Sequence, residues 1–221
     1  MLPVINHHIQ QTILTDLMRT DGLRFGQLRP DGMDSNAFMY HLKHLLRDRY
    51  VEKVDDRYRL THSGKTYVTS LSSTNTRPRL QPKLISILAL TNESGQYLLA
   101  QRLEQPSLGT WMLPSGKQHF DESPEQHVVR ESLEQFGADI VLSRRGLADI
   151  RISYDDQLVT HLIAHIYSGN HAGPVPDTTD RFVYAYHDVG ELSDDQLTPG
   201  TRQICDALVG SSELFYLSLD V

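Results

Sequence analysis

The chain has 221 residues, of which 39% are hydrophobic and 22% charged, a composition that excludes an intrinsically disordered protein. No apolar run approaches the ~20 residues that a membrane-spanning helix needs, and the first twenty residues lack the basic start and continuous apolar centre of a secretory signal. Because Cys205 is the one cysteine, an internal disulfide is excluded, and we expect a cytoplasmic protein without a membrane partner.

The charge of the chain changes sign along its length. The net charge is −7, but residues 1–80 carry 12 lysines and arginines against 8 aspartates and glutamates, whereas the remainder carries 9 against 20. A polar run, 70–79, separates the two parts and has a proline near its end. This pattern predicts two modules with different partners, at 1–75 and 83–221, joined by a linker at 76–82.

The first module begins with three helical patterns that are followed by a strand pair. The apolar spacing, the caps and the alternation predict these elements in chain order: helices 5–19, 24–28 and 35–48, strands 50–54 and 57–61, and a short helix 63–70. The third helix has a core stripe of Phe38, Leu42, Leu45 and Leu46, and Asp34 or Ser35 caps it.

This order of elements resembles a winged helix-turn-helix domain. The resemblance implies that the third helix enters a DNA major groove while the hairpin lies against the backbone, usually in a dimer. The side chains suited to base or phosphate contacts are Asn36, Tyr40, Lys43, His44, Arg47 and Arg57. Two other interpretations remain open, since a polar helix face is often simply solvated and winged helices also serve as protein-interaction modules.

The second module reads as strands around an embedded helix. Residues 83–90 are an apolar run, Asn92–Gly95 is turn chemistry, and 96–101 returns as a second strand of a hairpin. The later expected elements are strands 138–142, 147–154, 159–167 and 181–187 and a helix 202–209.

The embedded helix has clear ends and two distinct sides. Ser123, Pro124 and Gln126 form a capping box with proline at the first helical position, and Gly137 stands where the helix should stop. The helical spacing predicts an inward stripe of Val129, Leu133 and Phe136. On the opposite side lie four polar residues, His127, Glu131, Glu134 and Gln135.

Glu131 and Glu134 are three residues apart, so their side chains are neighbours on the helix surface. Mg²⁺ prefers oxygen ligands and usually takes one or two carboxylates together with water and substrate phosphates. The pair therefore suits a hard divalent cation, although a solvated acidic helix face is the commoner meaning of such a pair. For His119, Asp121 and His127 we expect surface positions.

The stretch from Gly116 to Ala138 resembles the Nudix signature, G-x5-E-x7-R-E-U-x-E-E-x-G-U, where U is aliphatic. The residues that fall in register are Gly116, Glu122, Arg130, Glu131, Glu134, Gly137 and Ala138. Three residues depart from the family pattern: Ser132 at an aliphatic position, Gln135 for the second Glu of the pair, and Ser115 for a glycine just upstream.

The resemblance covers about residues 81–210 and implies a mixed sheet sandwiched between helices, which makes the whole chain an α+β protein. It also implies cleavage of a pyrophosphate linkage in a nucleoside diphosphate derivative, with Mg²⁺ or Mn²⁺ as cofactor. Glu131 and Glu134 would then be metal ligands, Gln135 a weaker neutral one, and Arg130 would hold Glu122 and fix the loop.

Two other functions fit the same residues. A degenerate Nudix module can sense a nucleotide derivative without cleaving it and regulate transcription through the first module, a hypothesis that Gln135 and Ser115 motivate. Alternatively, the first module only mediates homodimerisation of a hydrolase. The substrate would be selected by loops such as 172–180 and by the strand and loop at 182–192.

Overall fold

The computed structural model describes residues 5, 7–71, 80–138, 140–211 and 213–221. The chain divides into two compact units, Met1–Leu80 and Gln81–Val221, and each is considered by itself. Most of the predicted linker, 76–82, falls on 72–79 and so lies outside the described residues. No described helix combines the length and the apolar character needed to cross a bilayer.

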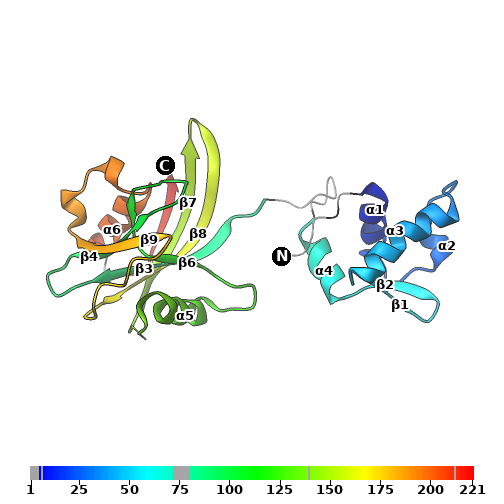
Figure 1. Ribbon diagram of the computed structural model, residues 1–221, viewed down its shortest axis with the longest axis horizontal. Coiled ribbons are helices and arrows are strands. Elements are labelled where there is room, and N and C mark those ends of the chain that lie inside the picture. Colours follow the sequence, from blue (N-terminus) through cyan, green and yellow to red (C-terminus); the bar gives the residue numbers. More distant parts are fainter. Residues whose placement is uncertain (1–4, 6, 72–79, 139, 212) are drawn as a thin grey trace. The chain divides into compact units, whose positions relative to one another are not determined.

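The first unit has four helices and a two-stranded hairpin among its described residues, in the order expected from the sequence (Figure 1). Its elements are α1 His8–Leu17, α2 Phe25–Leu28, α3 Ser35–Arg47, β1 Val51–Val54, β2 Arg57–Leu60 and α4 His62–Thr69.

Helix α3 forms where its cap and its apolar spacing place it. The Asp34 carboxylate accepts hydrogen bonds from the backbone N–H groups of Asn36 and Ala37, which satisfies two of the free donors at the helix start. Phe38, Leu42 and Leu45 are fully buried, together with the apolar residues of α1, and Leu46 packs partly buried against them. The predicted core stripe is therefore confirmed, and its opposite side faces outward.

Among the residues that the structure describes, the second unit has an eight-stranded sheet and two α-helices. Its elements are β3 Lys83–Thr91, β4 Tyr97–Arg102, β5 Trp111–Met112, β6 Ser115–Lys117, α5 Pro124–Phe136, β7 Ser143–Tyr154, β8 Gln157–Asn170, β9 Phe182–His187, the 3₁₀ turns η1 Val189–Glu191 and η2 Asp194–Gln196, α6 Thr201–Gly210 and β10 Phe215–Asp220.

The sheet is mixed, as predicted. Its main order is β10-β7-β8-β3-β4-β5, while β6 pairs with β3 and β9 pairs with β4. The β3–β8 and β7–β10 pairs are parallel, and the other pairs are antiparallel. A central strand that is buried on both faces explains the nearly continuous apolar run of β3.

The two helices cover opposite faces of this sheet (Figure 1). Because side chains alternate along a strand, Ile85 and Ile87 of β3 join the core under α6, which includes Ile204. Leu88 joins a second core with Val128 of α5. The sandwich of helix, sheet and helix expected for the second module is thus confirmed.

Two parts of the sheet differ from the prediction. The expected strand at 138–142 is absent from its described residues, where Val141 is 90% exposed and β7 begins only at Ser143. The described residues of this short apolar run form no strand because no neighbouring strand supplies backbone hydrogen bonds to them. In contrast, β10 was not predicted, although Phe215, Leu217 and Leu219 alternate with exposed residues and β10 pairs in parallel with β7.

Candidate active site

Helix α5 has the predicted ends. The Ser123 hydroxyl accepts from the Gln126 N–H at 3.2 Å, and the Gln126 side-chain oxygen accepts from the Ser123 N–H at 2.9 Å, which completes the capping box. At the other end Gly137 adopts a left-handed conformation, with φ 66°, and its N–H donates to the carbonyl of Leu133.

The predicted inward stripe of α5 is confirmed only at Phe136, which packs partly buried against the core that contains Val128. His127, Val128, Glu131 and Ser132 are buried, whereas Val129 and Leu133 are 42% and 50% exposed. The helix buries polar side chains because they have partners: the Ser132 hydroxyl donates to the carbonyl of Val128, and the other two polar residues are engaged as described below. The expected surface position of His127 was therefore wrong, since its side chain is fully buried; His119 and Asp121 are exposed as expected.

Three nitrogen atoms surround the carboxylate of Glu131, which is only 7% exposed. Arg130 Nη1 lies 2.9 Å from Oε1, Gln135 Nε2 lies 2.7 Å from Oε2, and His127 Nε2 lies 3.4 Å from Oε1. Burial alone raises the pKa of Glu131, but its polar contacts with His127, Gln135 and Arg130 outweigh burial and leave this pKa below its ordinary value. Glu131 is thus a buried carboxylate that stays ionised.

Gly116 is required by the same carboxylate. It lies on β6, where it pairs with Ser86 of β3 and faces α5. A Cβ atom at this position would stand 1.9 Å from Glu131 Cδ and 2.1 and 2.2 Å from its two oxygens. Any side chain at 116 would therefore displace Glu131, which explains in physical terms why the signature begins with glycine.

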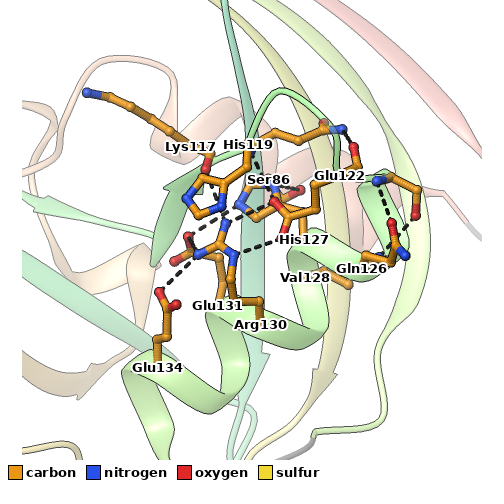
Figure 2. Close-up of polar contacts among 12 residues, drawn as sticks. Ser86, Lys117, His119, Glu122, Gln126, His127, Val128, Arg130, Glu131 and Glu134 are labelled. Carbon is orange, nitrogen blue, oxygen red and sulfur yellow. Dashed lines mark hydrogen bonds and ion pairs between the residues drawn. The ribbon is translucent and has the colours of Figure 1, made fainter. Parts of the chain in front are cut away.

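Arg130 ties three acidic side chains together (Figure 2). Its Nε and Nη2 bind the two oxygens of Glu122 at 2.7 and 3.0 Å, and its Nη1 binds Glu131 Oε1 and Glu134 Oε2, each at 2.9 Å. The Arg130 guanidinium beside Glu122 lowers the pKa of that carboxyl from 4.5 to about 2. The predicted ion pair between Arg130 and Glu122 is present, and it fixes the loop before α5 to the helix.

Gln135 presents its nitrogen, not its oxygen, to this cluster. Both neighbours of its amide, the Glu131 carboxylate and the Ser115 carbonyl at 3.3 Å, can only accept hydrogen bonds. The Gln135 oxygen can become a cation ligand only if the amide turns and gives up its 2.7 Å bond to Glu131.

The donor set suits a cation that is completed by water and substrate phosphates. Among the residues that the structure describes, no three His, Cys, Asp or Glu side chains come together as a metal-binding group. Glu131 and Glu134, however, offer oxygens to the same nitrogen of Arg130. Two carboxylates with open positions are what Mg²⁺ commonly takes from a protein when phosphates supply the rest.

These carboxylates line a cleft of about 780 Å³. Five of its lining side chains are cationic, namely Lys83, Arg102, Lys117, Arg130 and Arg181, and Arg181 is paired with Glu104 at 2.8 Å. Its apolar and aromatic lining includes Ile85, Ile87, Ile150, Leu162, Tyr154 and Phe182. Positive charge beside an apolar wall suits a ligand with a polyanionic part and a flat organic part.

The residues predicted to contact DNA lie on α3 and on the β1–β2 hairpin. Asn36, Tyr40, Lys43 and Arg47 are exposed and His44 is half-buried. Tyr40 packs edge-on against His44, with ring centroids 4.5 Å apart. Arg47 is paired with the adjacent Asp48, and Arg57 donates to the Gly22 carbonyl at 3.1 Å, so both guanidinium groups already have partners.

Comparisons with known proteins find Nudix hydrolases that are similar to the second unit. The chain is 24% identical, over 116 residues, to the uncharacterized Nudix hydrolase YvcI of Bacillus subtilis (strain 168); the match covers 52% of this chain and 73% of that protein. Among solved structures, a MutT NUDIX hydrolase from Burkholderia pseudomallei has a TM-score of 0.50 and 26% identity, covering 58% of this chain and 99% of that one. The MutT protein from Bacillus halodurans also has a TM-score of 0.50, at 20% identity, covering 61% and 86%.

Family models account for most of the chain. A domain of unknown function, DUF7347, matches residues 2–71, and the NUDIX domain matches residues 81–208, more than half of the chain. With the signature helix, the mixed sheet and the Glu131 cluster in place, the chain belongs to the NUDIX family.

Proposed function

We propose that this chain hydrolyses the pyrophosphate linkage of a nucleoside diphosphate derivative in a reaction that depends on Mg²⁺ or Mn²⁺. The observation that carries the proposal is Glu131, a buried carboxylate that three nitrogen atoms surround and that packs against Gly116 in the lining of the cleft. A bound divalent cation would neutralise phosphate charge and lower the pKa of a water molecule.

The protein's own residues would orient and balance the charges. Glu131 and Glu134 would hold the cation, which would require Arg130 to give up its contact with Glu134 while its bonds to Glu122 keep the loop in place. Glu134 is free to move because its side chain is 58% exposed. Lys83, Arg102 and Lys117 would attract the phosphates from the cleft wall.

The test is release of a mononucleotide from a panel of nucleoside diphosphate derivatives, with and without Mg²⁺ or Mn²⁺. We expect cation-dependent turnover that Glu131→Gln abolishes, while Glu93→Gln, an equivalent change in an exposed turn, leaves it intact. Unchanged turnover in Glu131→Gln refutes the role given to this residue.

A second function has its own support. The hydrogen bond from Gln135 to Glu131 already offsets part of the site's negative charge, so the cleft has less need of a cation than one with a glutamate at 135. The chain would then bind a nucleotide derivative without cleaving it and act as a transcriptional regulator. DNA affinity that changes with a nucleotide derivative, in the absence of turnover, would favour this function.

We propose further that the first unit is a winged helix-turn-helix that binds double-stranded DNA as a homodimer, with α3 in the major groove. The support is the exposed polar face of α3, which belongs to the basic first module. The intact chain should bind DNA at low ionic strength and lose affinity as salt rises. An absence of salt-dependent binding refutes the proposal, and a dimer without DNA affinity would leave the first unit a dimerisation module.

A further inference from the structure

We propose that His127 is a positioning residue that holds the Glu131 carboxylate in the orientation a cation ligand needs, and that Ser86 anchors the ring to the central strand. The inference rests on the proposed cation site at Glu131 and Glu134. The Nudix signature leaves position 127 unspecified.

The contacts of His127 run from the sheet to the signature helix. Its side chain has no exposed surface, and Ser86 below it on β3 is equally buried. Ser86 Oγ lies 3.2 Å from His127 Nδ1, and His127 Nε2 lies 3.4 Å from Glu131 Oε1. The imidazole therefore connects the central strand to the carboxylate.

The chemistry of the partners assigns the proton on the ring. A carboxylate oxygen accepts hydrogen bonds, so the Nε2 that faces Glu131 Oε1 is the nitrogen expected to carry hydrogen. The Ser86 hydroxyl lies against Nδ1 and can donate to it, so it is compatible with a proton on Nε2. The serine thus holds the ring from the strand side while Nε2 directs an N–H at Glu131, in the way that outer partners commonly orient the residues around metals.

His127 differs from the other two donors in where it stands. Arg130 and Gln135 line the cleft with Glu131, so their bonds occupy the oxygens that an entering cation would take; His127 is not among the cleft residues. Its Nε2 makes no hydrogen bond of good geometry within the described part of the chain, since 3.4 Å is long for one. Once Arg130 and Gln135 release Glu131, this N–H can close on Oε1 from the buried side without competing with the cation.

Burial of the polar side chains of Ser86 and His127 would be unfavourable without an interaction such as this one with Glu131. An unsatisfied imidazole nitrogen in a protein interior destabilises the fold, and an apolar side chain at 127 would avoid that loss. Ser86 and His127 therefore stabilise the core less than apolar side chains would, but together they can orient the Glu131 carboxylate.

The test is a titration of the full chain with Mn²⁺ alone. Binding is measured as the loss of the electron paramagnetic resonance signal of the free ion. Wild-type chain should bind one ion and Glu131→Gln should not. We expect His127→Leu to weaken Mn²⁺ about 10- to 100-fold, and His127→Gln, which keeps an N–H donor, to recover most of the loss. The control is His62→Leu, at the exposed start of α4 in the first unit, which should leave binding unchanged.

The outcomes separate the two proposals. If the wild-type chain binds Mn²⁺ and Glu131→Gln does not, but folded His127→Leu binds as tightly as wild type, the positioning role is overturned and the cation site stands. If the wild-type chain binds no Mn²⁺, both fall. Nitrogen-15 NMR of the wild-type imidazole gives a test without any variant: we expect the proton on Nε2, and a ring protonated on Nδ1 alone overturns the inference.

Discussion

Replacement of Gln135 by glutamate would restore the family pattern and should make the protein dependent on a cation. The change converts the 2.7 Å hydrogen bond between Gln135 and Glu131 into a contact between two negative charges. A hydrogen bond to a charged group contributes about 1.5–3 kcal/mol, and two like charges ~3 Å apart repel by about 5 kcal/mol at an effective dielectric constant of 20.

The full repulsion will not be realised, because residue 135 is partly exposed and its side chain can swing away. We therefore expect the cation-free variant to lose roughly 3 kcal/mol of unfolding free energy, which for a unit of this size lowers Tm by roughly 10 °C. A cation between the two carboxylates reverses the sign. At a free concentration 100 times Kd it stabilises the folded state by about 2.7 kcal/mol.

The assay is thermal unfolding of wild type and Gln135→Glu, each with chelator and with Mg²⁺ or Mn²⁺, alongside turnover. We expect the variant to have the lower Tm in chelator, the larger gain on adding the cation, and faster hydrolysis. Gln203→Glu, the same change at an exposed position of α6, should show none of these effects. A variant as stable as wild type in chelator would refute the pairing of residues 131 and 135, and an absent cation response would refute the site.

Three further predictions follow from other contacts. Gly116→Ala places a methyl group where Glu131 now lies, so we expect turnover to fall about 100-fold and stability to fall by about 1–3 kcal/mol, measured by mononucleotide release and thermal unfolding. The pKa of Glu122 is lowered from 4.5 to about 2, so its ion pair stabilises the fold fully above pH 4.5 and the contribution is lost as the pH falls toward 2. Glu122→Gln should therefore flatten the acid limb of unfolding free energy against pH. Lys43→Ala should weaken DNA binding and reduce the slope of log affinity against log salt by about 1.

Each of these predictions has a contradicting result, and the glycine and lysine substitutions also have matched controls. Gly26→Ala, at a position with open space around it, should be neutral, and an equally neutral Gly116→Ala would contradict the close approach to Glu131. An acid limb that is the same with and without Glu122 would contradict its ion pair. Lys65→Ala, at an exposed position of α4, should leave the salt slope unchanged. An unchanged slope in Lys43→Ala would contradict contact between α3 and phosphate.

Local signals in the sequence predicted the ends and the types of most elements. The capping box at Ser123 and the left-handed Gly137 define α5, and the stripe from Phe38 to Leu45 defines the buried side of α3. These features depend on neighbours within one or two helical turns, so they are visible in a single sequence.

The orientation of α5 depended on a residue that is far away in the sequence. Apolar spacing favoured Val129 and Leu133 as the buried side, but the helix turns His127 and Glu131 inward because Ser86, 41 residues before His127, supplies a partner from β3. Long-range pairing of this kind leaves no periodic signal. The available hint of a buried polar cluster was that two polar residues, His127 and Glu131, lie one helical turn apart within the matched signature.

The donor set of the site was only partly predictable. The positions of Arg130, Glu122 and Glu131 followed from the signature, and the structure brings all three together. The direction of the Gln135 amide could not be predicted in this way. Its nitrogen points toward Glu131 because both of its neighbours, the Glu131 carboxylate and the Ser115 carbonyl from β6, accept hydrogen bonds, and only the structure brings β6 to this position.

The most direct test of the account is anomalous diffraction from crystals of the full chain soaked with Mn²⁺. We expect one strong peak in the cleft, within coordination distance of Glu131 and Glu134, with Arg130 moved off Glu134 but still bound to Glu122. A cleft without a peak, or a peak that avoids both carboxylates while Arg130 keeps its present contacts, would contradict the claim that α5 presents these two side chains to a cation.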